Sequence, residues 1–250
     1  MASREVAIER VDGDARTDDR DRVVVEAALE LRARSTAVAT IMRTPGHDVE
    51  LVRGLLHAES VTAGRIDQIE ADAIDLDCDP AAFAARGLLS TAACGVCGRV
   101  AIADLERRAR EVGADTTIAH AVLAALPDRL RAAQSVFADT GGLHGAALFD
   151  ARTGALAAAR EDVGRHNAVD KLVGWALDAR VDASVHALLL SGRAGYELVQ
   201  KAVMFGVPIV ASVSAPSSLA IELAERFNIA LVGFVRGARC NIYSHAWRVI

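Results

Sequence analysis

The sequence predicts an α/β protein with a small N-terminal part and a more regular C-terminal part. Hydrophobic residues make up 52% of the chain but aromatic residues only 4%, so the interior is aliphatic, as in α/β or helical proteins. In the second half, short apolar strands alternate with helices of about ten residues, a pattern typical of an α/β layer with several parallel strands. At 250 residues, the chain can bury a sizeable core.

The N-terminal part is expected to begin with a disordered leader, residues 1–21, because Asp and Arg dominate it without periodicity. Residues 22–115 then form a small α/β domain. Its expected elements are two strands within 22–43 that turn near 34–36, a helix capped by Thr44 that runs to about Ala58, a strand over 66–76, and a helix over 100–110. Residues 88–99 are expected to form a loop of small side chains that can move.

The C-terminal part, residues 116–250, is expected to form a second, larger domain. Its helices are predicted over 118–134, 167–179, 196–205 and 217–227, and its strands over 143–149, 155–159, 186–191, 208–212 and 230–234. Polar and glycine-rich segments separate these elements.

Composition argues against several classes of function. The net charge of −5 gives no overall attraction for nucleic acid or anionic lipid. No stretch approaches about 18 uncharged apolar residues, and the N-terminal residues lack the apolar run of a signal peptide. We therefore expect neither a membrane span nor secretion. The expected location is the cytoplasm, where thiols stay reduced.

The segment Cys94-Gly95-Val96-Cys97 is the most distinctive chemical feature of the chain. A thiolate can attack a sulfur donor and hold the transferred atom as a persulfide, and a second thiol two residues away can attack the first. A structural zinc site would need further paired ligands, whereas Cys78 and Cys240 are isolated and resemble packing residues. Dithiol redox chemistry remains an alternative at this point, and no permanently bound metal is predicted.

Four polar clusters lie at ends of the predicted C-terminal strands. They are residues 140–144, 161–167, 191–193 and 234–239. Because loops at the carboxyl ends of strands form the ligand crevice of open α/β sheets, and three of these loops combine Arg with Gly, they predict a phosphate or pyrophosphate site. Its candidate residues are His144, Arg165, His166, Ser191 and Arg193. His166 is either a base, a phosphate ligand or a packing residue at a helix start.

Taken together, these segments resemble the FdhD family of formate dehydrogenase accessory sulfurtransferases. The resemblance runs from about Arg22 to Ile250 and rests on five further motifs besides the cysteine segment: TGGLH (140–144), EDVGRHNAVDK (161–171), SGR (191–193), SAP (214–216) and GFVRG (233–237). It departs from the family pattern at Ser60, Gly145 and Gly195, where glycine, alanine and serine are common.

The resemblance implies a function that the spacing of the motifs alone does not indicate. Sulfur would pass from a cysteine desulfurase to Cys94 as a persulfide, assisted by Cys97, and then to a molybdenum or tungsten bis-molybdopterin guanine dinucleotide cofactor. The cofactor would go to apo-formate dehydrogenase. The cofactor-binding segment, also expected to accept GDP, matches Phe234, Val235, Arg236, Gly237, Ala238 and Arg239.

The resemblance also implies a homodimer whose C-terminal domain is a three-layer fold similar to cytidine deaminases. Deamination itself is not expected, because the chain lacks the H-x-E and P-C-x-x-C motifs of zinc deaminases. The alternative function is a chaperone that inserts the cofactor and uses the CxxC segment only as a redox latch. A third possibility is a dithiol oxidoreductase that is indifferent to GDP.

Overall fold

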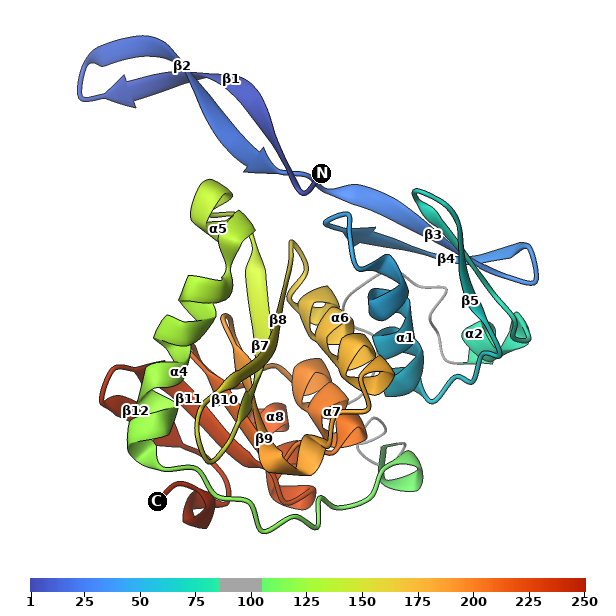
Figure 1. Ribbon diagram of the computed structural model, residues 1–250, viewed down its shortest axis with the longest axis vertical. Helices are drawn as coiled ribbons and strands as arrows, with labels where there is room; N and C mark the ends of the chain where they lie inside the picture. The colour runs from blue at the N-terminus through green and yellow to red at the C-terminus, as the bar shows by residue number, and fades with distance from the viewer. Residues whose placement is uncertain (86–104) are drawn as a thin grey trace.

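A computed structural model of the chain describes residues 1–85 and 105–250. These residues form a projecting two-stranded hairpin, a four-stranded sheet with its helices, and a six-stranded sheet between two layers of helices (Figure 1). Both predicted parts are present as α/β units, so the predicted fold class is confirmed.

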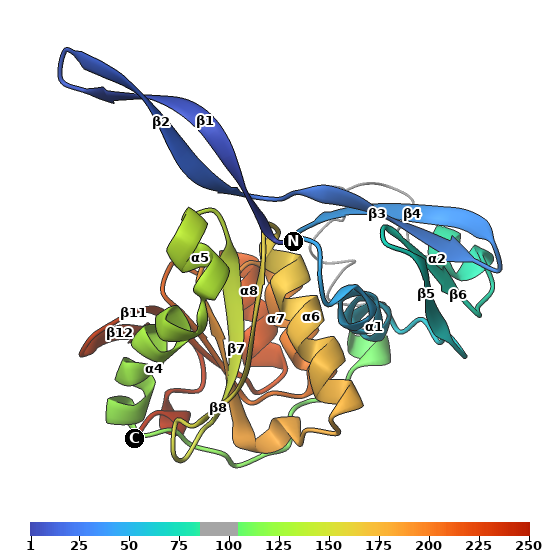
Figure 2. The same ribbon diagram turned by 45° about the horizontal axis from the view of Figure 1, so that its top comes forward.

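The first two strands, β1 (Ser3–Asp12) and β2 (Ala15–Val24), form the hairpin, which extends away from the rest of the molecule (Figure 2). The prediction that residues 1–21 are a disordered leader is therefore wrong. The Arg side chains that suggested disorder form ion pairs with acidic side chains across the two strands, at 2.7 to 3.1 Å. Gly13 adopts the positive φ, 60°, that a two-residue hairpin turn requires.

The N-terminal sheet has the strand order β4-β3-β6-β5. Its strands are β3 (Ala27–Ala33), β4 (Thr36–Arg43), β5 (Ile66–Glu70) and β6 (Ala73–Leu76), accompanied by the helices α1 (Asp48–Glu59) and α2 (Ala81–Ala85). The predicted turn near 34–36 is confirmed, with Arg34 and Ser35 at positive φ. The single strand predicted over 66–76 is instead an antiparallel pair, because residues 71–72 turn the chain back.

Residues 105–115 pack on the C-terminal part of the molecule. Leu105 and Val112 are buried in the same hydrophobic cluster as the C-terminal helices. The backbone N–H of Val112 donates to the carbonyl of Phe227 at 3.0 Å. The boundary predicted after residue 115 is therefore too late, because these apolar side chains fill the C-terminal core.

The C-terminal sheet has the strand order β12-β11-β10-β9-β7-β8. Its strands are β7 (His144–Asp150), β8 (Leu156–Asp162), β9 (His186–Leu190), β10 (Ile209–Ser212), β11 (Ala230–Arg236) and β12 (Arg239–Ile242). The three central strands β9, β10 and β11 are parallel, as predicted, and the others pair antiparallel with their neighbours. The sequence did not predict β12, which makes residues 234–239 the tip of a hairpin and not an open loop.

Helices cover both faces of this sheet. One layer contains α4 (His120–Ala133), continued by α5 (Ser135–Thr140), and the other contains α6 (Arg165–Asp178), α7 (Tyr196–Phe205) and α8 (Ser218–Arg226) (Figure 1). Alternate strand residues divide between the two cores. Leu188 and Leu190 face α6–α8, whereas Ala187 and Leu189 face α4. None of the described helices has both the length and the apolar composition needed to cross a membrane.

The two sheets are joined where α1 packs against α6 through a glycine on each helix. A Cβ on Gly54 would lie 2.0 Å from the carbonyl oxygen of Asp170, and a Cβ on Gly174 would lie 1.9 Å from that of Glu50. Both glycines are therefore needed for the close approach of the two backbones. Beside them, Arg160 binds the Glu50 carboxylate through two hydrogen bonds, at 2.6 and 2.9 Å.

A buried carboxylate, Asp162, completes this junction. Its Oδ2 accepts from the Thr44 backbone N–H at 3.1 Å and lies 2.7 Å from Lys171 Nζ. Its Oδ1 accepts from Gly164 N–H at 2.8 Å and from Asn167 Nδ2 at 2.9 Å. Lys171 also donates to the Thr44 carbonyl at 2.7 Å. The Thr44 segment is thereby held on the C-terminal domain, and the prediction that Thr44 caps α1 is wrong, since His47 is the N-cap.

We expect Gly174→Ala to separate α1 from α6, because the new methyl group would overlap backbone atoms that cannot move independently of the helix. The free energy of unfolding should fall by about 2 kcal/mol or more, measured by urea denaturation. Gly195→Ala is the matched control, because a Cβ there meets no described atom within 4 Å. Equal stability of the two variants would contradict the proposed role of the contact.

We expect Lys171→Met to destabilise the protein by about 3–5 kcal/mol, because Asp162 would remain buried without its cationic partner. Urea denaturation measures this loss. Arg34→Met is the control, since its partner Asp77 is on the surface and the Arg34 side chain is 67% exposed; exposed pairs contribute little. A Lys171→Met protein as stable as the control would show that the junction does not depend on this pair.

Candidate functional site

The strand pairing brings the predicted polar loops to one edge of the C-terminal sheet. The parallel strands β9, β10 and β11 end there, and the antiparallel strand β7 begins there. The end of β8 lies at the same edge, because His144 pairs with Asp162. Segments 140–144, 161–167, 191–193 and 234–239 are therefore neighbours, as the sequence predicts.

His144 and Ser191 lie side by side at the centre of this edge. The backbone N–H of Gly145 donates to Ser191 Oγ at 2.7 Å, and Ser191 N–H donates to the Gly145 carbonyl at 2.9 Å. A Cβ on Gly192 would lie 3.2 Å from His144 Nδ1, which is tighter than an ordinary contact. Because Gly192 has no side chain, the His144 imidazole can lie against the 191–193 loop.

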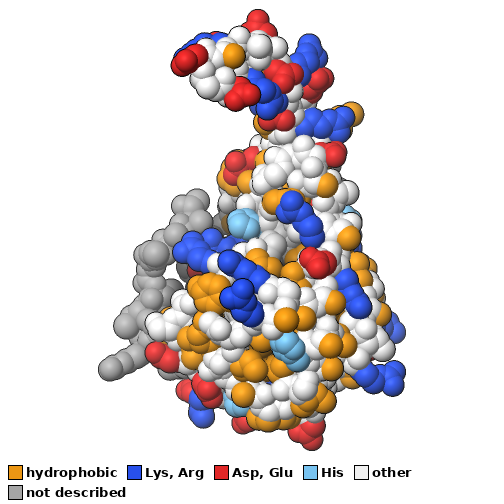
Figure 3. Space-filling model, turned by 90° about the vertical axis from the view of Figure 1, so that its left-hand side faces the viewer, with side chains coloured by type: hydrophobic (Ala, Val, Ile, Leu, Met, Phe, Trp, Pro, Cys, Tyr) orange, Lys and Arg blue, Asp and Glu red, His pale blue; other side chains and the backbone are white. Residues whose placement is uncertain are grey.

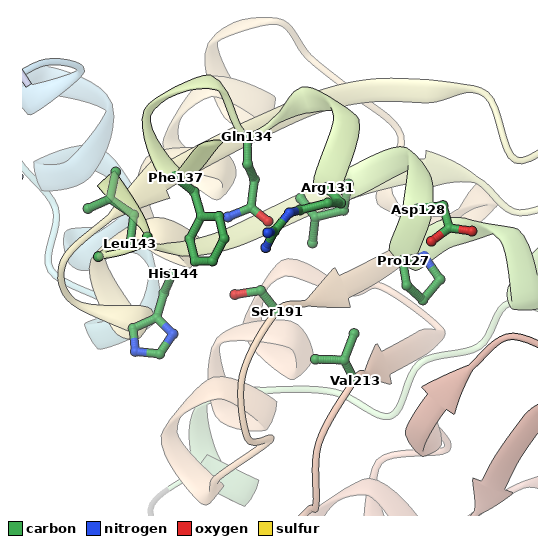
Figure 4. Close-up of a pocket in the computed structure, with 12 residues that line it drawn as sticks. Pro127, Asp128, Arg131, Gln134, Phe137, Leu143, His144, Ser191 and Val213 are labelled. Carbon is green, nitrogen blue, oxygen red and sulfur yellow. The ribbon is translucent and has the colours of Figure 1, made fainter. Parts of the chain in front are cut away.

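A cavity of about 520 Å³ opens beside His144 and Ser191 (Figure 4). Its walls come from α4, α5, the 141–144 loop and the ends of β9 and β10, and its lining includes Arg131, Gln134, Phe137, Leu143 and Val213. This size is in the range of small-molecule sites in proteins. The sequence did not indicate the contribution of α4 and α5, because these residues belong to no motif and no pattern shows which face of the helix they occupy.

A second group of polar side chains lies at the N-terminus of α6. Arg165 and His166 are the first two residues of this helix, where backbone N–H groups favour a bound anion. His166 Nε2 lies 2.8 Å from Glu197 Oε2, and this hydrogen bond is the main cause of the lowered pKa of Glu197. The Nε atom of Arg165 is buried and has no hydrogen-bond partner among the described residues.

His144 lines the cavity and is also close enough to Arg165 and His166 for their charges to shift its pKa. Burial lowers it below the ordinary value of 6.5, and the nearby charges of Arg165 and His166 lower it further, opposed by Asp162. His144 is thus favoured in its neutral form. The edge offers a cation, a neutral imidazole and a helix N-terminus close together, a combination suited to an oxyanion.

The tip of the β11–β12 hairpin forms the outer part of the edge. Phe234 and Gly237 both have positive φ, 53° and 54°, and the Arg236 guanidinium lies 5.8 Å from the Phe234 ring centroid. Arg236 Nε also donates to the Val213 carbonyl at 3.2 Å, so this tip is tied to the cavity wall. Val235 points into the core and is unavailable to a ligand.

Exposed arginines, namely Arg193, Arg236 and Arg239, surround the edge. Figure 3 shows basic side chains gathered on one face of the molecule, with a histidine beside them; they are arginines, because the two lysines, Lys171 and Lys201, are buried. The overall charge of the chain is −5, so the positive character is local. A local patch of this kind would attract a phosphorylated ligand without binding nucleic acid generally.

The four cysteines fall into two groups. Cys94 and Cys97 lie outside the described residues. Cys78 is buried in the N-terminal core, and Cys240 packs against the C-terminal core. Burial raises the pKa of both thiols, which keeps them protonated and less reactive. The prediction that these two are packing residues is confirmed.

Fold and site together define a three-layer α/β protein with an arginine-lined edge and an adjoining cavity. A sequence model of the FdhD/NarQ family matches residues 24–250, so the chain belongs to that family, and the resemblance found from its motifs is confirmed. The hairpin lies almost wholly before the matched residues.

Two relatives illustrate the similarity. The sulfur carrier protein FdhD of Mycobacterium tuberculosis is 44% identical over 254 residues, which cover 92% of each chain. That of Thermoplasma acidophilum is 46% identical over 222 residues, which cover 84% of this chain and 78% of the relative. A crystal structure of "a putative formate dehydrogenase accessory protein" from Desulfotalea psychrophila has the same fold, with a TM-score of 0.82, 23% identity and full coverage of both chains.

We expect Arg165→Gln to raise the pKa of His144, because a positive charge that opposes protonation is removed. Titration of the imidazole protons by NMR measures the change. Arg193→Gln is the control, since Arg193 is exposed and does not contribute to the lowered pKa. A His144 pKa that is the same in both variants would mean that Arg165 does not act on the imidazole.

Proposed function

We propose that this protein carries sulfur as a persulfide on Cys94. It would accept the sulfur from a cysteine desulfurase and transfer it to a molybdenum or tungsten bis-molybdopterin guanine dinucleotide cofactor destined for formate dehydrogenase. Membership of the FdhD/NarQ family supports this proposal, as do relatives named sulfur carriers at 44–46% identity.

The proposed binding of the cofactor rests on one observation. His144, Arg165 and His166 lie together at one edge of the sheet, beside a cavity. A dinucleotide cofactor consists of charged phosphates joined to flat heterocycles. Arginine and a helix N-terminus suit the phosphates, and a partly apolar cavity suits a heterocycle. A generic dithiol oxidoreductase would need neither.

The sulfur steps follow from thiol chemistry. The Cys94 thiolate attacks the terminal sulfur of the donor persulfide, the donor leaves as a thiolate, and Cys94 keeps the S–SH group. Cys97 can then attack the sulfur of Cys94, which forms a Cys94–Cys97 disulfide and expels the terminal sulfur as hydrosulfide for the metal. The two thiols supply the two electrons that the sulfur gains, and a cellular thiol reductant must afterwards reduce the disulfide.

We expect Cys94→Ala to abolish activation of formate dehydrogenase, because no persulfide can form at the carrier position. Cys97→Ala should be milder, since external thiols can also release the sulfur. Intact-mass analysis after incubation with a cysteine desulfurase and cysteine should show one added sulfur atom on the unaltered protein and none on Cys94→Ala. Cys240→Ala is the control, because its thiol packs against the core.

GDP binding, measured together with activation of formate dehydrogenase, separates the sulfur carrier from an insertion chaperone that uses the cysteines only as a redox latch. Cys94→Ala should still bind GDP, whereas Arg239→Ala should bind it weakly, because a charged contact to the phosphates is lost. If the protein lacking both Cys94 and Cys97 still activated formate dehydrogenase, the carrier proposal would be wrong and the chaperone would remain.

A further inference from the structure

The hairpin of β1 and β2 has two strand edges that pair with no other strand of the described residues. Each strand is 10 residues long, and the hairpin extends away from both sheets (Figure 2). Its contacts with the rest of the described chain come mainly from the root of β2, where Arg22 pairs with Asp139 at 3.2 Å and Val24 lies against Gly142. A two-stranded hairpin is only marginally stable by itself in water, so pairing with further strands would stabilise it.

The register of the hairpin determines which backbone groups of each strand point outward. Val25 N–H donates to the Ala2 carbonyl at 2.8 Å, and these two residues continue the register in which Ser3 faces Val24. Hydrogen-bonded pairs alternate with non-hydrogen-bonded pairs along an antiparallel ladder. The odd-numbered residues of β1 and the even-numbered residues of β2 therefore direct their N–H and C=O groups away from the hairpin.

The outer edge of β2 is unsuited to pairing with a second copy of itself. In an antiparallel pair of identical strand edges, outward-pointing residues lie opposite each other, so the twofold axis passes through one residue and its copy. Residues 18–21, in the middle of β2, are all charged. An axis at any of them sets like charges directly opposite each other, which is destabilising. Charges of this kind protect a strand edge from association.

The outer edge of β1 has the opposite character, because the middle of this strand is the apolar run Val6-Ala7-Ile8. With the twofold axis at Ile8, the two isoleucines face each other and Arg4 lies opposite Asp12 of the second copy, on both sides of the axis. No charged residue of β1 then faces a like charge. An axis one residue to either side sets glutamate against glutamate, so the charges favour the register centred on Ile8.

We propose that the outer edge of β1 is an interface that pairs antiparallel with the same edge of a second copy of this chain. The product is a four-stranded sheet with the order β2-β1-β1-β2. Its outer edges are the charged β2 strands, so the assembly closes as a dimer. The surface lies outside the residues that match the family, and the inference does not depend on the proposed function.

The first test is sedimentation velocity of the full-length protein over a range of concentrations. The unaltered protein should show a reversible equilibrium between monomer and dimer. Ala7→Pro should raise the dissociation constant of the dimer about tenfold or more, because it removes an outward N–H from the shared ladder and leaves the bonds within the hairpin in place. Asp18→Pro is the matched control, since it removes an outward N–H from the other edge and should leave the dimer intact.

An exchange of charges tests the register itself. Within its own hairpin Arg4 faces Val23 and Asp12 faces Ala15, so neither charge has a charged residue directly opposite. Arg4→Asp alone and Asp12→Arg alone should each weaken the dimer, because each sets like charges opposite each other in the second copy's strand. The protein that carries both substitutions should dimerise as the unaltered protein does. Damage to the hairpin alone would not be reversed in this way.

Three results would overturn the inference. If the unaltered protein stays monomeric at every concentration, the β1 edge does not bind a second copy and is left to a strand of another protein. A dimer as stable in Ala7→Pro as in Asp18→Pro would place the interface elsewhere on the molecule. If the combined charge variant dimerises no better than the two single variants, the register is wrong. Persulfide formation on Cys94 is a separate measurement, so the proposed function would stand in each case.

Discussion

The arrangement of the functional edge depends on one buried carboxylate, Asp162. It lies at the end of β8 and accepts hydrogen bonds from the Thr44 backbone and from Asn167, while it also pairs with Lys171. These contacts fix the N-terminal domain, the end of a strand and the start of α6 to one another. Because a buried charge without its partners is costly, the three segments cannot separate without a large loss of stability.

This junction explains how one short motif can serve both structure and function. Within residues 161–171, Asp162, Asn167 and Lys171 point toward the N-terminal domain and are occupied by structural contacts. Arg165 and His166 lie between them in sequence but on another side of the same helix start, where His166 contacts Glu197. The periodicity of the helix separates the two sets. Residues that anchor the fold therefore also fix the helix start that carries the proposed ligand-binding residues.

The site has two chemically different halves that meet at His144. One half is cationic, with Arg165 at the N-terminus of α6, and the other is a cavity whose polar groups include Gln134. A ligand with an anionic part and a flat heterocyclic part would match both.

Local pattern in the sequence determined the α/β layer with parallel strands, most helix positions and the gathering of the polar loops, because strand and helix periodicity, together with parallel pairing, leaves few alternatives. Only the tertiary structure decided which charged and polar groups are buried. Asp162 meets Thr44 across 118 positions of sequence, and Gln134 gains its place from a glycine on another element. The hairpin of residues 3–24 is a further example, because its opposite charges meet only when the two strands pair. A side chain's environment is set by distant segments, which local pattern cannot specify.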